Sequence, residues 1–347
     1  MHSRPTRILT LTLSAFALVL LAGTAAAQPF GSWTLFDRSD VGNYFQIPHS
    51  PALNPTGQIT IEGWVDVDDG SVTNGCSNII GKGFSDNWWV GICGNTLRTY
   101  LSGSARTAGN IGAPGWHHFA VTFNGGQRCH YIDGRLAACW AQVGPLATNT
   151  DPVRIGDDVD FHNAAPNGAI NEIRLWNVAR STQQIRDTIN VPLTFPRPGL
   201  VAVWANGSGT DVVGPHDGVM VGSVPALTFP VAFGCSNTPT QLCAHNRYIV
   251  TADYESGIGN GQATRTDPST FRSGIFWFFN STNWEVMVKV LNGCGINNHW
   301  WVFTAATTNV FYRMEVLDVE RGRNKVYFNY AGPPAPAVTD TVAFDCP

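Results

Sequence analysis

The feature that most constrains this chain is a repeated pattern of short runs rich in Val, Ile, Thr, Phe, Tyr and Trp, separated by Gly, Asn, Asp and Pro. Runs of this kind are typical of β-strands, and the residues between them are turn formers. A helical pattern is expected only at residues 180–189, where Ser181-Thr-Gln-Gln184 resembles a helix-capping sequence. We therefore predict an all-β fold with one short helix. The strands we expect span residues 58–65, 77–82, 88–93, 96–101, 116–123, 127–132 and 170–176.

The chain is expected to divide into an export signal and two β-rich domains. Residues 1–27 combine a basic start, a largely apolar stretch and the small residues Ala25-Ala26-Ala27, which is the pattern of a cleaved signal peptide. The residues that follow suggest two domains at about 150 residues per domain. We predict a first domain at 28–190, a border segment and linker rich in Pro and Gly at 191–234, and a C-terminal module at 235–347.

Charge and hydropathy limit the partners of this chain. It carries 21 Lys and Arg against 25 Asp and Glu, whereas binding to nucleic acid draws on clustered Lys and Arg. No apolar stretch after the signal approaches the ~20 residues of a membrane helix. Thr24 stands where a lipid-modified cysteine would follow Leu20-Leu-Ala-Gly23. We therefore expect no nucleic acid partner, no membrane anchor, and a secreted protein in an extracellular or periplasmic location.

The cysteines predict disulfide bonds. All eight lie after the signal segment, and in an oxidising compartment an even number favours four disulfides. Counting outward from a three-residue turn at 133–135 places Cys129 opposite Cys139. Counting outward from a loop near residue 84 places Cys76 opposite Cys93. Three pairings stay open for the remaining cysteines, which are Cys235, Cys243, Cys294 and Cys346.

Several short motifs follow one another in the first half of the chain. They are Ile59-Thr-Ile-Glu-Gly-Trp-Val65, Ile79-Ile-Gly-Lys-Gly83, Trp116-His-His-Phe-Ala-Val-Thr-Phe123, Tyr131-Ile-Asp-Gly134, Ile155-Gly156 and Ala169-Ile-Asn-Glu-Ile-Arg-Leu-Trp-Asn177. In this order they resemble the laminin-G-like, concanavalin A-like lectin domains, although the family usually has Asp where this chain has Asn171. The resemblance implies an antiparallel jelly-roll β-sandwich. Residues 199–224 resemble the segment that borders such domains. The last hundred residues resemble an uncharacterised β module of exported bacterial proteins, and we expect a second, smaller β-sandwich there.

A catalytic function is not expected. Glucanases with a jelly-roll fold hold a nucleophile and an acid about 5 to 5.5 Å apart. The nearest match here is Glu315-Val-Leu-Asp318-Val-Glu320, and its first interval turns Glu315 to the face opposite the other two. We interpret these three as solvated charges at a strand end. A Gly-x-Ser-x-Gly nucleophile motif is absent from the sequence.

Histidines suggest a metal site only at first sight. His117, His118 and His130 are expected on neighbouring strands, where imidazoles could bind a metal ion. Because His117 and His118 are consecutive, their side chains leave opposite faces of the strand. We therefore expect all three to be structural.

Calcium is the better metal hypothesis. In the pentraxins, which share the jelly roll, an Asp-Asn pair and an acidic loop hold calcium. The resemblance implies that Asp86, Asn87, Asp158 and Asp160 are the corresponding ligands here. Two loops far apart in sequence would then supply hard oxygen ligands. The alternative is ordinary turn chemistry, since Asp and Asn are common turn formers.

One tryptophan is a candidate for contact with a ligand. Alternation along a strand should bury one indole of the pair Trp88-Trp89 and expose the other. Trp88 directly follows the predicted calcium loop, so we predict that it stacks on the ligand.

These observations predict a secreted, non-catalytic binding protein. Its laminin-G-like domain would recognise a glycan or an extracellular protein surface through loops at one rim, with calcium as the cofactor to be considered. The first alternative is a structural or adhesive component that acts through protein–protein contacts. The second is a polysaccharide hydrolase.

Overall fold

The structure is a computed structural model of the chain. The predicted signal peptide at 1–27 and part of the predicted linker, 223–234, lie outside the residues that it describes. The described residues are 34–36, 42–67, 75–111, 116–160, 168–205, 207, 209–222, 235–267, 269–321 and 323–346.

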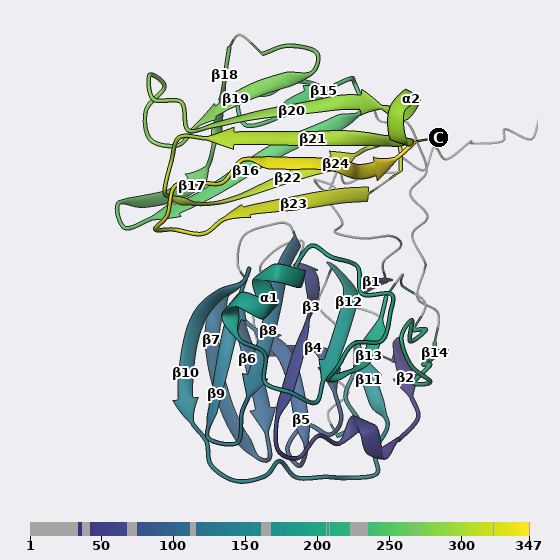
Figure 1. Cartoon of the computed structure of the whole chain (residues 1–347). Coiled ribbons are helices and arrows are strands. Elements are labelled where there is room, and N and C mark those ends of the chain that lie inside the picture. The colour runs from purple at the N-terminus through teal and green to yellow at the C-terminus, as the bar shows by residue number, and fades with distance from the viewer. Residues whose placement is uncertain are drawn as a thin grey trace, which may run out of the picture.

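The N-terminal half is a sandwich of two antiparallel sheets, drawn in purple to teal in Figure 1. The first sheet contains, in spatial order, β1 (Thr34–Phe36), β12 (Gly168–Trp176), β3 (Ile59–Val67), β8 (Trp116–Phe123), β9 (Gln127–Ile132) and β10 (Arg135–Ala141), with β13 (Leu200–Trp204) also paired to β12. The second contains β14 (Val219–Val221), β2 (Tyr44–Ile47), β11 (Val153–Ile155), β4 (Cys76–Gly81), β5 (Trp88–Cys93), β6 (Thr96–Leu101) and β7 (Ser104–Asn110). Apolar side chains such as Ile61, Val90 and Phe119 fill the space between the sheets.

The C-terminal part is a second sandwich, drawn in green to yellow in Figure 1. One of its sheets contains β15 (Leu242–Ala244), β16 (Tyr248–Ser256), β22 (Phe311–Asp318) and β23 (Arg323–Asn329), with β17 (Gly259–Gln262) paired to β16. The other contains β18 (Thr264–Thr266), β19 (Ser273–Trp277), β20 (Val286–Gly293), β21 (His299–Ala306) and β24 (Val338–Asp345), and α2 (Cys294–Asn297) joins β20 to β21. Phe276, Val302 and Met314 lie in its core. The all-β prediction is confirmed.

The predicted strands coincide with β3, β4, β5, β6, β8, β9 and β12, with ends that differ by at most two residues. The predicted helix is α1 (Thr182–Thr188). A separate one-turn helix, η1 (Pro51–Leu53), lies between β2 and β3. Ser181 caps α1: its hydroxyl accepts a bond from the Gln184 amide, and the Gln184 side chain accepts one from the Ser181 amide. The border segment contributes β13 and β14, one strand to each sheet of the N-terminal sandwich.

Four disulfides join the cysteines: Cys76–Cys93, Cys129–Cys139, Cys235–Cys243 and Cys294–Cys346. In the β9–β10 hairpin Cys129 lies directly opposite Cys139. The predicted three-residue turn is wrong, because Ile132 pairs with Arg135 across the two residues Asp133 and Gly134, which both have positive φ. A bulge at Ala137 then restores the pairing of the two cysteines.

The two sandwiches pack directly on each other. Trp64 and Trp116, on the outer face of the first sheet, belong to one apolar cluster with Val326 and Phe328 of β23. Figure 1 shows β23 as the strand of its sandwich nearest to α1 and β3. The guanidinium of Arg186 on α1 lies 3.8 Å from the centre of the Tyr330 ring. These contacts make the two sandwiches one packed unit.

Within the described residues, no helix is both long and apolar enough to cross a bilayer.

His117, His118 and His130 are all buried. The Nε2 of His130 lies 2.8 Å from the Thr99 hydroxyl and so links the two sheets. His118 lies on the outer face, edge-on to Trp64, with 5.3 Å between ring centres. In the part of the chain that the structure describes, no group of three or more His, Cys, Asp and Glu side chains is placed to hold a metal ion. Burial lowers the pKa of both His118 and His130 to about 4.

We expect acid to destabilise the protein between pH 6.5 and pH 4. Because His118 is neutral in the folded state, its contribution to stability is fully present above its unfolded pKa of 6.5 and is lost as the pH falls toward about 4. The loss for this one side chain is about 3 kcal/mol at pH 4. Urea unfolding at pH 7 and pH 4 should therefore show a smaller pH dependence for His118→Phe than for the wild type. His299→Gln, on the partly exposed His299, is the control. Equal pH dependence in all three proteins would contradict this assignment.

Candidate functional site

The predicted calcium ligands lie on two loops that touch each other. Asp86 and Asn87 lie between β4 and β5, and Asp158 and Asp160 follow β11. The Phe84 amide donates to Asp160 Oδ2 at 2.9 Å, which joins the loops. However, each carboxylate accepts a hydrogen bond from a different part of the protein. Asp158 Oδ1 accepts from the Asp160 amide, and Asp86 Oδ1 accepts from the Asn149 side chain.

The ammonium group of Lys82 contacts several polar groups next to these two loops. Lys82 Nζ donates to Asn149 Oδ1 at 3.1 Å and to the Asp151 carbonyl, and it lies 3.1 Å from His49 Nδ1. Burial lowers the pKa of Lys82, while Asp151 and Asp86 act in the opposite direction. Asn149 Oδ1 also accepts from Asn87 Nδ2. A calcium ion on these oxygens would lie beside a positive charge, so the residues around Lys82 do not fit one.

Trp88 is not available for stacking on a ligand, and this prediction is wrong. Its indole is fully buried, and its Nε1 donates to the Leu53 carbonyl inside the sandwich. Trp89 on the other face is also fully buried, because Phe84 and Tyr100 cover it. Alternation therefore separates the two indoles as expected but exposes neither.

The first sheet carries two carboxylates that share one arginine, and sequence reasoning missed them. Glu62 on β3 and Glu172 on β12 both contact Arg174: Nη2 lies 2.6 Å from Glu172 Oε1 and Nη1 lies 3.4 Å from Glu62 Oε1. Arg180 donates to Glu62 at 2.6 Å. The sequence could not reveal the pair, because the two glutamates meet only through the β3–β12 pairing.

These two glutamates are sealed from solvent. Arg174 donates to the carbonyls of Thr188 and Val191, in and after α1, so the helix end closes over the pair. Both side chains are buried. A glycosidase needs its two carboxyl groups on either side of a bound glycosidic bond, and this pair is occupied by arginines instead.

The acidic residues of β22 are also structural. We interpreted Glu315 and Asp318 as solvated charges, and this is wrong, because both are buried in ion pairs. Glu315 lies 3.2 Å from Arg313, and Asp318 forms two bonds with Arg247, at 2.8 and 2.6 Å. Glu320 is exposed, as predicted.

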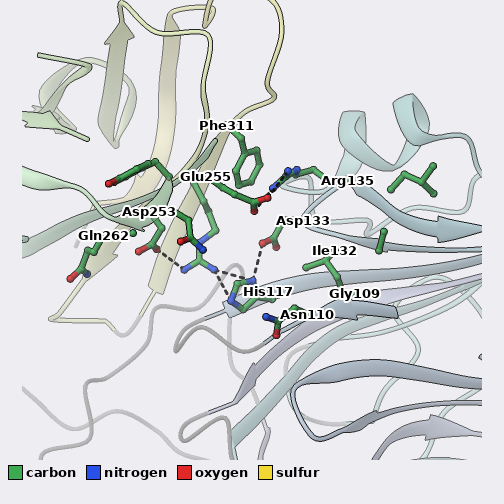
Figure 2. Close-up of a pocket in the computed structure, with 16 residues that line it drawn as sticks. Gly109, Asn110, His117, Ile132, Asp133, Arg135, Asp253, Glu255, Gln262 and Phe311 are labelled. Carbon is green, nitrogen blue, oxygen red and sulfur yellow. Dashed lines mark hydrogen bonds and ion pairs between the residues drawn. The ribbon is translucent and has the colours of Figure 1, made fainter. Parts of the chain in front are cut away.

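A half-open cavity of about 510 Å³ lies between the two sandwiches (Figure 2). One wall comes from β7, β8 and the β9–β10 hairpin of the N-terminal sandwich, and the other from β16, β17 and β22 of the C-terminal sandwich. Figure 2 shows Asp253, Glu255 and Gln262 facing His117, Asp133 and Asn110 across it. A volume of this size accommodates a small ligand.

Arg313 lines this cavity and contacts residues of both sandwiches. Its Nη1 donates to the Trp116 carbonyl at 2.6 Å and lies 3.3 Å from the His117 ring nitrogens. Its Nη2 lies 3.3 Å from Asp253 Oδ2. On the N-terminal side, His117 Nδ1 lies 2.8 Å from Asp133 Oδ2. The chain of contacts from Asp133 to Asp253 therefore crosses the junction between the sandwiches.

A second ion pair closes the edge of the cavity. Arg135 donates to both carboxylate oxygens of Glu255, at 2.6 and 3.0 Å. Its guanidinium also lies 4.2 Å from the centre of the Phe311 ring. Beside this pair, the exposed side chains Asn260 and Gln262 on β17 complete the wall. Exposed planar amides beside carboxylates suit a ligand rich in hydroxyl groups.

None of these cavity residues was predicted to line a binding site, and His117 was expected to be structural. Asp253, Glu255 and Gln262 belong to the C-terminal module and meet the N-terminal sandwich only when the two pack together. The sequence carries no signal for that contact.

Comparison with known proteins identifies the N-terminal fold. Residues 39–186 match the family model described as the concanavalin A-like lectin/glucanases superfamily. The predicted resemblance is thus confirmed for these residues. No curated protein matches the sequence.

Solved structures with a similar backbone include the following three, which cover different shares of the chain. A Bacteroides ovatus protein provisionally named as carbohydrate binding is 19% identical, with 60% of this chain and 62% of that chain covered and a TM-score of 0.48. A pentraxin from Limulus polyphemus is 15% identical, with 55% and 93% covered and a TM-score of 0.37. Domain 4 of an extracellular arabinanase from Geobacillus stearothermophilus, in complex with arabinotriose, is 16% identical, with 47% and 84% covered and a TM-score of 0.35.

Proposed function

We propose that this protein is an extracellular, non-catalytic glycan-binding protein whose site is the cavity between its two sandwiches. The superfamily that residues 39–186 match includes lectins and glucanases. The sealed state of Glu62 and Glu172 favours binding over cleavage, since a substrate must reach the reacting carboxyl groups. Four disulfides favour an oxidising, extracellular location.

The cavity itself carries the proposal. Its walls are held by two ion-pair systems, Arg135 with Glu255 and Arg313 with Asp253, so its shape exists before a ligand arrives. Exposed amides such as Gln262 offer both donors and acceptors to sugar hydroxyl groups.

A glycan microarray tests this function. We expect the wild-type protein to retain saccharides, and Gln262→Ala to bind the retained saccharide about three- to tenfold more weakly, because one or two hydrogen bonds are lost. Titration calorimetry measures the change in Kd. Asn283→Ala, on an exposed loop of the C-terminal sandwich, is a control that should leave Kd unchanged. An array that retains no saccharide would contradict the function and favour the structural or adhesive alternative. Release of reducing sugar from a retained polysaccharide would favour the hydrolase.

Calcium is a separate test at the rim loops. Because the Lys82 ammonium already lies among the oxygens of Asn149 and Asp151, we expect Tm to be the same in excess chelator and in millimolar calcium. A rise in Tm with calcium would contradict this expectation, since a ligand that binds only the folded state must stabilise it. Asp86→Asn and Asp160→Asn would then identify the ligands.

A further inference from the structure

Carboxylates outnumber cations among the side chains that line the cavity. The acidic groups are Asp133, Asp253 and Glu255, and the basic groups are Arg135 and Arg313, with His117 beside them. A ligand placed in the cavity therefore meets a surface of net negative charge when the histidine is neutral.

The cations of the cavity are already committed to the protein. Arg313 is only 4% exposed and is shared between Trp116, Asp253 and Glu315. Arg135 gives both of its terminal nitrogens to Glu255, and one face of its guanidinium is covered by Phe311. Neither arginine has a pair of guanidinium N–H groups left to bind a carboxylate or sulfate group on a ligand.

Asp253 differs from the other carboxylates. Its side chain is 41% exposed, and among the described residues a single hydrogen bond reaches it, the 3.3 Å contact from Arg313. Glu255, in contrast, is held at both oxygens by Arg135. A carboxylate accepts several hydrogen bonds, so Asp253 retains acceptor capacity that faces the cavity.

The environment of Asp253 also makes a further donor favourable. Partial burial raises the pKa of Asp253, and Arg313 and His117 offset this only in part. An additional hydrogen bond from a cationic or neutral donor would stabilise its charged form.

We propose that the cavity binds saccharides with an amine group more tightly than neutral ones, and neutral ones more tightly than acidic ones. The preference for the amine would come from a hydrogen bond to Asp253. This inference rests on the proposed function, because it assigns a ligand class to the same cavity. An amine would form a charge-assisted hydrogen bond with Asp253. A carboxylate or sulfate group would meet Asp253 and Glu255 with no free guanidinium to pair with.

The test uses sets of saccharides that share one ring and differ in one group. Immobilised 2-amino, neutral and uronic acid forms of the same oligosaccharides are probed with the wild type, Asp253→Asn and Asp267→Asn. Asp267 lies on the C-terminal sandwich in an exposed pair with Arg265, so its variant controls for loss of one surface charge. We expect the wild type and Asp267→Asn to bind the amino form about tenfold more tightly than the uronic acid form.

The outcomes separate the two proposals. In Asp253→Asn the amino form should lose its advantage over the neutral form, while neutral binding changes little. Equal or tighter binding of the uronic acid form by the wild type, or an amine preference that persists in Asp253→Asn, would overturn the inference and leave glycan binding standing. If the wild type retains none of the three forms across all sets, the glycan function itself fails.

Discussion

Replacement of Arg313 by Met should lower the free energy of unfolding by about 3–5 kcal/mol, because it leaves the buried Glu315 carboxylate without its counter-charge. Arg313 is buried and contacts Glu315 and Asp253 in its own sandwich. It also donates to the Trp116 carbonyl of the other sandwich at 2.6 Å. Its loss should therefore weaken both the C-terminal sandwich and the junction that forms the cavity. Urea unfolding at pH 7 measures the change.

Two further variants make this result specific. Arg323→Met removes an exposed partner of Asp345 and should change the free energy of unfolding by less than about 1 kcal/mol. The double variant Arg313→Met with Glu315→Gln should recover part of the lost free energy of unfolding, because the unpaired charge of Glu315 is removed. Equal stability of Arg313→Met and Arg323→Met would contradict the role given to Arg313.

Removal of the Cys294–Cys346 disulfide should destabilise the protein by about 4 kcal/mol, according to the chain-entropy model. The bond joins α2 to the residue that follows β24, across a sequence separation of 52. It closes by far the longest of the four loops, and Cys346 lies in the core of the C-terminal sandwich. The double variant Cys294→Ser with Cys346→Ser is compared with the wild type by thermal and urea unfolding.

The short Cys235–Cys243 bond is the matched control. Its sequence separation of 8 predicts a loss of about 2.5 kcal/mol when both cysteines are replaced by serine. A larger loss for this short loop than for Cys294–Cys346 would contradict the account, since it would mean that constraint of the unfolded chain is not the main effect.

Much of the N-terminal fold could be predicted because its signals are local. Alternation and turn residues fixed the ends of β5, β6, β8 and β9 to the residue. The pairing of Cys129 with Cys139 was predicted even though the turn between them was not, because a bulge at Ala137 compensated for the shorter turn. The bulge depends on how the two strands pair, so it cannot be predicted from the sequence of either strand alone.

The site could not be predicted because it depends on contacts between distant segments. Trp88 was expected to be exposed, but its indole points into the core of the sandwich, and Phe84 and Tyr100 cover Trp89 on the outer face of β5. The cavity requires the β9–β10 hairpin and the β16–β17 hairpin to meet across the junction of the two sandwiches. Packing of whole domains sets this geometry, and no spacing within the sequence reports it.

Hydrogen–deuterium exchange with and without a saturating concentration of the saccharide that the array retains tests the location of the site most directly. We predict slower exchange at β9–β10, residues 127–141, together with β16–β17, residues 248–262, because a ligand in the cavity covers both hairpins. Protection confined to the rim loops at residues 82–87 and 142–160, with both hairpins unchanged, would contradict the account.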